Sequence, residues 1–354
     1  MQTLRFSRLV MMVLAVIGLA AGAGAQSRPP IGNLKVVVVP ARATYALDGA
    51  ALYGLSVLAV APAADDPPQF TDWSTPVNLG SPVNSTYYEG CPTISKSGLS
   101  LFFRTNLPGG QGGADIWVTQ RDSLDEPWDA PVNLGEKVNS SYNETCTGLS
   151  PDEHWMVFVS DRPGGCGLQD LWITHRQNRR DDFGWESPTN LGCGINSASH
   201  DNAPRYFDDP ATGETLLYFA GGRPGGPGSG DIWVTPALDG TKDTFGPPSL
   251  VAEFSIAGYN DSHPLMRKDG LEFIFVSNRP GGLGSTDLWS STRASMEDPW
   301  PDPVNLTSVN SAPTDFRPTL SFDGRMLIFA SDRPGGLGGG DLYVSTRTKL
   351  PASR

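Results

Sequence analysis

Five acidic side chains recur at matching places along the chain, and their type and spacing could do chemistry. Around one opening they could bind a metal cation, an amine or the hydroxyls of a sugar. A structural role is the alternative, since a carboxylate can accept hydrogen bonds from backbone N–H groups of a neighbouring turn. The sequence favours the structural role, because the five copies are near-equivalent. These candidate ligand-binding residues are Glu89, Glu144, Asp201, Asp261 and Asp315.

The position two residues after each acid differs between the copies, which makes it a better place to look for function. It is occupied by Cys91, Cys146, Ala203, His263 and Arg317. His263 and Arg317 come from consecutive copies and could form a small polar patch that tolerates an anion. The alternative is that the histidine packs or makes an internal hydrogen bond. No cofactor is expected, and a cation held by the acidic ring is a further hypothesis.

Four cysteines allow two disulfides in an exported chain, with three possible connectivities. Cys91 and Cys146 occupy equivalent places in neighbouring copies. Cys166 and Cys193 fall in loops that a ring of repeats places on one face. Either pair can be bridged if its Cα atoms lie within about 7 Å. None of the four has Cys-x-x-Cys spacing, so disulfides are expected rather than zinc ligation.

An internal repeat organises these residues. A Pro-Gly-Gly phrase occurs five times, in steps of 55, 61, 56 and 54 residues. Its prolines are Pro108, Pro163, Pro224, Pro280 and Pro334. A period of this size is typical of repeat architectures. An aspartate follows the phrase in every copy, and we expect it to cap the tight loop. Four copies have an arginine before the phrase, which should pair with a carboxylate, whereas the first copy has Leu107.

Each repeat contains four strand-like segments. The first begins at the acidic residue, and the second is an apolar run such as Met326–Ser331. The third reads Asp-Leu-Trp-Val or a variant, and the fourth is centred on Pro-Val-Asn-Leu. Four antiparallel strands repeated radially make a β-propeller blade. The aromatic residue of the third segment, Trp in four copies and Tyr343 in the last, is expected in the core between blades.

Counting these segments predicts how the ring closes. The first three segments occur together five times, and the fourth segment also occurs five times. However, one fourth segment, Trp73–Leu79, precedes the first set, and the last set has none after it. If Trp73–Leu79 completes the last blade, no sheet edge is left open. We therefore predict an all-β, five-bladed propeller over residues 70–348, with four antiparallel strands per blade and closure by the N-terminal strand.

The segments outside the ring indicate export. Residues 1–25 have the charged start, apolar stretch and Ala-x-Ala site of a secretory signal peptide. Residues 26–69 are expected to be a poorly ordered lead or a membrane-proximal anchor, and residues 349–354 a short tail. The apolar stretches of the lead are too short for a stable membrane span. We predict a monomer that is periplasmic or extracellular.

The charge of the chain limits its partners. The formal net charge is −12 at pH 7. Such a surface repels nucleic acid and anionic lipid. Nucleic acid is therefore excluded as a partner, and a protein, a peptide or a glycan remains.

The repeat resembles the TolB-type, WD-repeat-like β-propeller family. The last copy carries the resemblance at Asp315, Pro318, Ser321, Asp323, Gly324, Phe329, Ser331, Arg333 and Asp341. The resemblance implies an extracytoplasmic propeller of a kind that often serves as a binding or assembly module. The chain departs from TolB itself, since we identify no separate α/β domain before the ring. It also lacks the peptidoglycan-binding domain of some relatives, so the partners of those proteins do not carry over.

Two functions compete on this evidence. The leading interpretation is a non-catalytic module that binds a glycan, peptide or protein through its loop-rich face. The alternative is a five-bladed glycoside hydrolase that uses carboxylates at the mouth of the channel. Hydrolysis needs carboxylates in unlike environments, so that one is protonated while another is ionised. Because the repeated carboxylates are near-equivalent, the sequence favours binding and names no catalytic residue.

Overall fold

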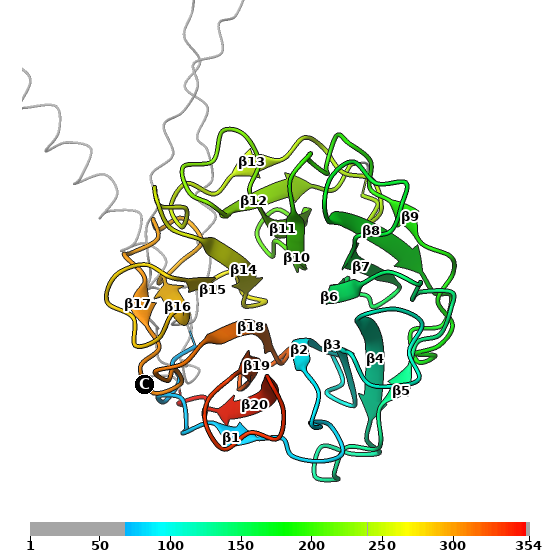
Figure 1. Ribbon diagram of the computed structural model, residues 1–354. Coiled ribbons are helices and arrows are strands. Elements are labelled where there is room, and N and C mark those ends of the chain that lie inside the picture. Colours follow the sequence, from blue (N-terminus) through cyan, green and yellow to red (C-terminus); the bar gives the residue numbers. More distant parts are fainter. Residues whose placement is uncertain (1–67, 239, 352–354) are drawn as a thin grey trace, which may run out of the picture. The chain divides into compact units, whose positions relative to one another are not determined.

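The computed structural model describes residues 68–238 and 240–351, and every regular element in these ranges is a β-strand. The strands form five four-stranded sheets around a common centre (Figure 1). This confirms the predicted all-β, five-bladed propeller. The predicted signal peptide, residues 1–25, and nearly all of the lead, residues 26–69, lie outside the described ranges. Within those ranges, no helix has the length and apolar character that crossing a bilayer requires.

Each blade has an innermost strand, two middle strands and an outer strand, all antiparallel. The innermost strands are β2 (Glu89–Ile94), β6 (Glu144–Leu149), β10 (Asp201–Asp208), β14 (Asp261–Met266) and β18 (Asp315–Leu320). The second strands are β3 (Ser100–Thr105), β7 (Trp155–Ser160), β11 (Thr215–Gly221), β15 (Glu272–Ser277) and β19 (Met326–Ser331). The third strands are β4 (Asp115–Gln120), β8 (Asp170–His175), β12 (Asp231–Pro236), β16 (Asp287–Thr292) and β20 (Asp341–Thr346). The outer strands are β5 (Val132–Asn133), β9 (Thr189–Asn190), β13 (Ser249–Leu250), β17 (Val304–Asn305) and β1 (Val77–Asn78).

The outer strands are much shorter than the segments that predicted them. A proline directly precedes each one and has no N–H to add to a ladder, so pairing begins only after it. These prolines are Pro76, Pro131, Pro188, Pro248 and Pro303.

The N-terminal strand β1 closes the ring as predicted. It pairs antiparallel with β20, where Val77 lies opposite Val344 and Asn78 lies opposite Tyr343. Figure 1 shows β1 beside the red strand β20, although the two are at opposite ends of the described chain. Trp73, which is 7% exposed, packs in the core of this last blade.

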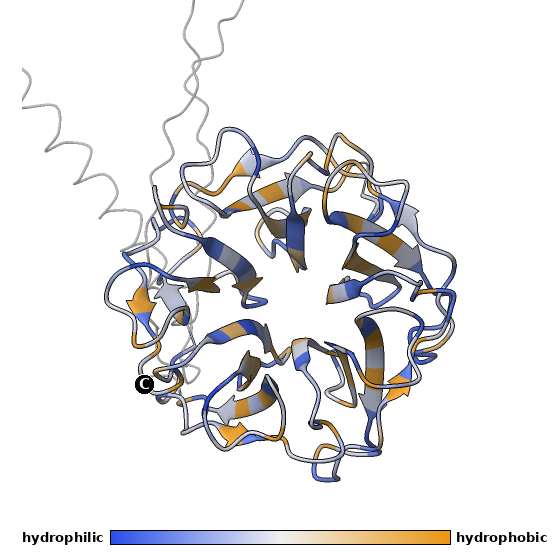
Figure 2. Ribbon diagram, in the orientation of Figure 1, coloured by the Kyte–Doolittle hydropathy of each residue, from blue (hydrophilic) through white to orange (hydrophobic). Residues whose placement is uncertain are grey.

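The hydrophobic core lies between neighbouring blades. Leu101 and Phe103 of the first blade pack with Ile328 and Leu342 of the last blade. Figure 2 shows apolar and polar residues in bands along the strands. The aromatic residues of the third strands are between 5% and 8% exposed, which confirms their predicted place in the core. They are Trp117, Trp172, Trp233, Trp289 and Tyr343.

A β-bulge interrupts every innermost strand at its third residue. The ladder to the second strand shifts there, for example between Gly90 and Thr93 of β2. The third residues have positive φ angles, of 51° at Cys91, 37° at Cys146, 52° at Ala203, 52° at His263 and 56° at Arg317. Left-handed backbone is uncommon outside glycine. Its recurrence in all five blades makes the bulge a regular part of this fold.

Candidate functional site

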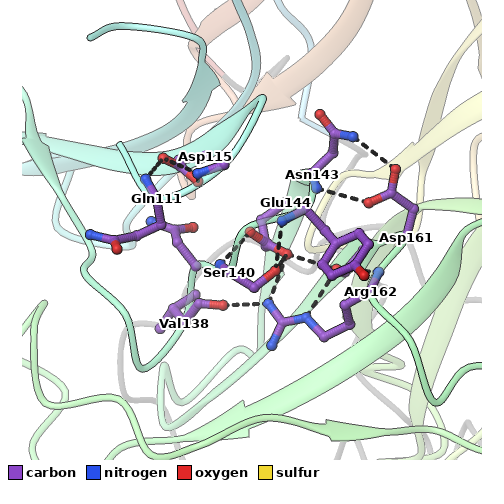
Figure 3. A network of polar contacts seen from close by, with 12 residues as sticks. Gln111, Asp115, Val138, Ser140, Asn143, Glu144, Asp161 and Arg162 are labelled. Carbon is purple, nitrogen blue, oxygen red and sulfur yellow. Dashed lines mark hydrogen bonds and ion pairs between the residues drawn. The ribbon is translucent and has the colours of Figure 1, made fainter. Parts of the chain in front are cut away.

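The five acidic residues of the predicted ring are buried, each with an exposure of 0%. Glu144 illustrates their contacts (Figure 3). Its carboxylate accepts hydrogen bonds from the Ser140 backbone N–H and the Ser160 hydroxyl, both at 2.7 Å. The corresponding backbone donors in the other blades belong to Ser85, Ser197, Ile256 and Ser311. These contacts fit the structural alternative, and a ligand at this mouth would meet no exposed ring carboxylate.

The predicted cation site also finds no support in these positions. Within the described ranges, no three ring carboxylates lie close enough together to share a metal ion. The one group of potential ligands that does is Cys91, Cys146 and His263. Its two sulfur atoms already form a disulfide with each other, so they are not thiolate ligands.

Four of the ring acids form ion pairs with the arginine before the Pro-Gly-Gly phrase, as predicted. The N–O distances are 2.9 Å for Arg162–Glu144, 2.5 Å for Arg223–Asp201, 2.8 Å for Arg279–Asp261 and 2.5 Å for Arg333–Asp315. In the first blade Leu107 replaces the arginine, and Glu89 has no such partner. Glu89 accepts hydrogen bonds from Ser85 and Thr105 instead, and burial raises the pKa of its carboxyl.

Replacing Glu89 by glutamine tests this difference. The pKa of Glu89 in the folded protein lies above its ordinary value of 4.5. The stability that this carboxyl group contributes is therefore complete below the unfolded-state pKa and is lost as pH rises through the raised pKa. Glutamine stays neutral at every pH. We therefore expect the free energy of unfolding of Glu89→Gln, relative to wild type, to increase as the pH rises from below 4.5 through the raised pKa of Glu89.

Urea denaturation across this pH range provides the measurement. Glu144→Gln is the control, because it leaves Arg162 without its partner and should cost about 3–5 kcal/mol at neutral pH. Parallel pH profiles for wild type and Glu89→Gln would contradict the assignment.

The aspartates that begin the third strands cap the preceding loops, as predicted. Asp115 accepts hydrogen bonds from the backbone N–H groups of Gln111 at 2.5 Å and Gly112 at 3.2 Å (Figure 3). The equivalent aspartates make the same kind of contact. They are Asp170, Asp231, Asp287 and Asp341.

Both predicted disulfides are present. Cys91–Cys146 joins the innermost strands of the first two blades, with 4.6 Å between the Cα atoms. Cys166–Cys193 joins two loops of the second blade, with a Cα separation of 5.5 Å. Disulfides persist in oxidising compartments, which agrees with an extracytoplasmic location.

His263 and Arg317 are close enough for the arginine to act on the histidine electrostatically. His263 Nδ1 lies 3.0 Å from the Ser262 hydroxyl, and Arg317 Nη1 donates to the Tyr88 hydroxyl at 2.8 Å. Burial, together with the charges of Arg317 and Arg205, holds the pKa of His263 well below its ordinary value. This histidine is therefore neutral at physiological pH.

Sequence reasoning missed Arg205, the fifth residue of its innermost strand. Its guanidinium donates to the backbone carbonyls of Pro92, Thr147 and Pro318, which belong to three other blades. This side chain therefore reaches across the channel. A comparison of the copies would have singled out the position, because no other blade has a charged residue there. The other blades have Thr93, Gly148, Leu265 and Thr319.

A cavity of about 520 Å³ lies at the end of the channel where the innermost strands turn into the second strands. We call it the hairpin-end cavity; its lining includes Glu153, Arg205, Asp208 and Phe322. Two departures from the fivefold pattern shape it. β10 has eight residues where the other innermost strands have six, and it ends at Asp208. Glu153 is the other departure.

Glu153 stands at a turn position that is glycine in three other blades. Its backbone N–H donates to the residue three before it, as those of Gly98, Gly270 and Gly324 do. Its φ angle of 63° matches their 71° to 75°. A side chain with this backbone conformation is strained, and such strain is often found at functional sites. The sequence signal for this residue is a glutamate where other copies have the turn glycine.

Glu153 and Asp208 have unlike surroundings. Asp208 is 43% exposed, forms an ion pair with Lys242 at 3.1 Å and accepts a hydrogen bond from the Thr215 hydroxyl at 2.6 Å. Glu153 accepts the backbone N–H of Lys96 at 2.6 Å. Within the described ranges, Glu153 forms no ion pair.

A third carboxylate of the hairpin-end cavity, Asp152, is engaged by its own turn. Burial alone would raise its pKa, but hydrogen bonds from the Ser150 hydroxyl and the His154 backbone bring the pKa below its ordinary value. Asp152 is therefore an ionised turn cap.

The rim of the hairpin-end cavity combines an aromatic ring with positive charge. Phe322 is 40% exposed. The ammonium groups of Lys96 and Lys268 lie 4.3 Å and 4.1 Å from the centre of its ring. Aromatic surface and hydrogen-bond donors together are what a sugar-binding rim requires.

No protein-family model matches the chain, and a search of curated proteins finds no similar sequence. Among solved structures, an α-L-arabinofuranosidase of Podospora anserina crystallised with cellotriose has a TM-score of 0.50 at 11% identity, covering 80% of this chain and 98% of that one. An α-L-arabinofuranosidase of Lactobacillus brevis has a TM-score of 0.51 at 13% identity, covering 77% and 98%. A structure described as a glycoside hydrolase has a TM-score of 0.53 at 11% identity, covering 79% and 94%. At such identities the likeness concerns the fold.

These comparisons correct the leading functional interpretation. We predicted a non-catalytic binding module and placed the glycoside hydrolase second. The solved structures named above are described as arabinofuranosidases or as a glycoside hydrolase, so the first choice was wrong, and these structures favour the alternative. The physical reason is that the carboxylates of the acidic ring are near-equivalent, whereas Glu153 and Asp208, which depart from the fivefold repeat, lie at the hairpin end. The resemblance to TolB-type propellers stays a prediction.

Proposed function

We propose that the protein is a glycoside hydrolase whose active site is the hairpin-end cavity. The observation that carries this proposal is the pair Glu153 and Asp208, two carboxylates in unlike surroundings that line one cavity. At the positions equivalent to each of them, the other blades have no carboxylate. Glycoside hydrolysis needs one carboxyl group that donates a proton and another that acts as a base or nucleophile. A volume of about 520 Å³ falls within the range of ligand sites.

The contacts of the two carboxylates assign their roles. Asp208, which forms an ion pair with Lys242, acts as the base or the nucleophile. Glu153, which forms no ion pair within the described ranges, donates a proton to the glycosidic oxygen as the bond from that oxygen to the anomeric carbon breaks. A water molecule supplies the hydroxyl that ends on the anomeric carbon, and its proton restores the acid. Phe322 offers its apolar ring to a sugar face at the rim.

A substrate screen tests the proposal. The solved structures named as arabinofuranosidases make chromogenic α-L-arabinofuranosides the first substrates to try, followed by a panel of other pentosides and hexosides. We expect wild-type protein to release the chromophore from at least one glycoside well above a heat-inactivated blank. Failure to cleave any glycoside of the panel would contradict the proposal.

The location follows from the same chemistry. An exported hydrolase would meet glycans in the periplasm or outside the cell, and the two disulfides suit either place. Fractionation of expressing cells, followed by N-terminal sequencing of the mature chain, distinguishes the two locations.

A further inference from the structure

Two arginines near the centre of the ring lack the carboxylate partners that other arginines there possess. Arg104 lies on β3 and Arg317 on β18. Neither forms an ion pair with any residue in the described ranges, whereas the arginines before the Pro-Gly-Gly phrases each pair with a ring acid. The chain carries a net charge of −12, so an unpaired positive cluster stands out against its surroundings.

Three nitrogen atoms in this region are buried without a hydrogen-bond partner. They are Arg104 Nε, Arg317 Nε and His263 Nε2. A buried donor that is left unsatisfied costs about 1–3 kcal/mol, and more when the group is charged. Three such atoms in three consecutive blades of the ring call for an acceptor, and most buried polar groups in proteins have one.

The two guanidinium groups face the same tyrosine. Their Cζ atoms lie 4.4 Å (Arg104) and 5.7 Å (Arg317) from the centre of the Tyr88 ring. Arg317 Nη1 also donates to the Tyr88 hydroxyl, while the Arg104 guanidinium donates to no acceptor in the described ranges. Gly90, directly opposite Arg104 in the ladder, leaves room for Arg317: a Cβ there would lie 3.0 Å from Arg317 Nη1.

The electrostatics agree with this geometry. Burial, and next the charge of Arg317, lower the pKa of Arg104 to about 10. Burial lowers the pKa of Arg317 as well. Both arginines nevertheless remain cationic at neutral pH. The protein therefore holds two like charges close together, offset in part by the charge of Glu89, which acts on Arg104 without forming an ion pair.

We propose that the centre of the ring binds one small oxyanion between Arg104 and Arg317, with His263 Nε2 as a further donor. Oxyanions suit this set because guanidinium groups donate to carboxylate, phosphate or sulfate in charge-assisted, geometrically matched pairs. When the Ser262 hydroxyl donates to Nδ1, the neutral His263 carries its proton on Nε2 and can donate it. This site is distinct from the hairpin-end cavity, whose lining includes neither Arg104, nor Arg317, nor His263.

Isothermal titration calorimetry and thermal unfolding test the site in the full-length protein. The probes are inorganic phosphate, sulfate and glucuronate, with sodium chloride at matched ionic strength as the background. We expect one equivalent of at least one oxyanion to bind and to raise the melting temperature with saturation. Binding of phosphate or sulfate alone would point to a free inorganic ion, and binding of glucuronate to the carboxylate of an acidic sugar. Both results support the site.

Arg104→Gln and Arg317→Gln should each weaken binding about 10- to 100-fold, since a hydrogen bond to a charged group is lost. Arg317→Lys should keep part of the affinity. Without anion, Arg317→Gln should melt no lower than wild type, because it removes an uncompensated charge. Arg325→Gln, which alters an exposed arginine paired with Asp323, is the matched control and should bind like wild type.

The proposal is overturned if wild type binds none of the three oxyanions, or if Arg104→Gln, Arg317→Gln and Arg325→Gln all bind them equally well. The variant Glu153→Gln/Asp208→Asn distinguishes this test from that of the proposed function. It should lose hydrolysis and keep oxyanion binding, because its two changes lie in the hairpin-end cavity.

Discussion

Glu153→Gln and Asp208→Asn are each expected to lower kcat by about 10²–10⁴-fold on any glycoside that the wild type cleaves. The reason is that glutamine cannot give up a proton to the leaving oxygen, and asparagine cannot act as base or nucleophile. Both changes preserve side-chain size, so substrate binding should change little and most of the loss should fall on kcat. Initial rates over a range of substrate concentrations provide the measurement.

Two controls sharpen this prediction. Asp302→Asn alters an exposed aspartate in another loop and should leave kcat unchanged. Glu153→Gly restores the residue that other blades use at this turn and relieves the left-handed strain, which costs a side chain about 1–2 kcal/mol. It should therefore be at least as stable as wild type and yet inactive. Full activity in Glu153→Gly would show that the glutamate plays no part in the reaction.

A chain that begins at Gly80, and so lacks β1, is expected to lose cooperative unfolding and to aggregate. The deletion leaves β20 with an unpaired edge, and exposed edges promote association between chains. It also removes Trp73 from the core of the last blade, and loss of a buried tryptophan alone costs about 3–5 kcal/mol. Differential scanning calorimetry and size-exclusion chromatography would follow both effects.

A circular permutant separates ring closure from simple truncation damage. In this permutant, residues 68–79 are attached after Pro351, so that β1 follows β20 in the chain as β5 follows β4 in the first blade. The structure places the two ends close together, since the Leu350 N–H donates to the Gln69 carbonyl at 2.8 Å. The permutant should recover a melting temperature near that of wild type. A truncated chain that melts like wild type would contradict the role assigned to β1.

The architecture could be predicted because the sequence pattern that specifies a blade is repeated along the chain. Alternating apolar strands and Pro-Gly-Gly loops recur five times, and counting the segments showed that Trp73–Leu79 closes the ring. The Cys91–Cys146 disulfide followed because equivalent residues of neighbouring blades must lie side by side, and Cys166–Cys193 followed because its two loops share one face of the ring. The bulges did not follow, since nothing in the types of Cys91, His263 or Arg317 indicates a left-handed backbone.

The candidate site was harder to predict because it depends on departures from the repeat. Glu153 replaces a turn glycine, which a closer comparison of the copies would have revealed. The position of Asp208 depends on the greater length of β10, and that of Arg205 depends on the close approach of the Pro204 backbone to Gly148, where a side chain would clash. These are consequences of three-dimensional packing, so the sequence alone drew attention to the acidic ring instead.

The left-handed third residue of every innermost strand has a consequence for how such a ring can evolve. The backbone holds this conformation with sulfur, methyl, imidazole and guanidinium side chains alike, so its shape does not depend on what the position carries. A substitution there changes the lining of the channel in one blade and leaves the hydrogen-bonded ladders of all five intact. The channel can therefore acquire a new charge, metal ligand or cross-link by a single mutation, while the scaffold around it stays the same.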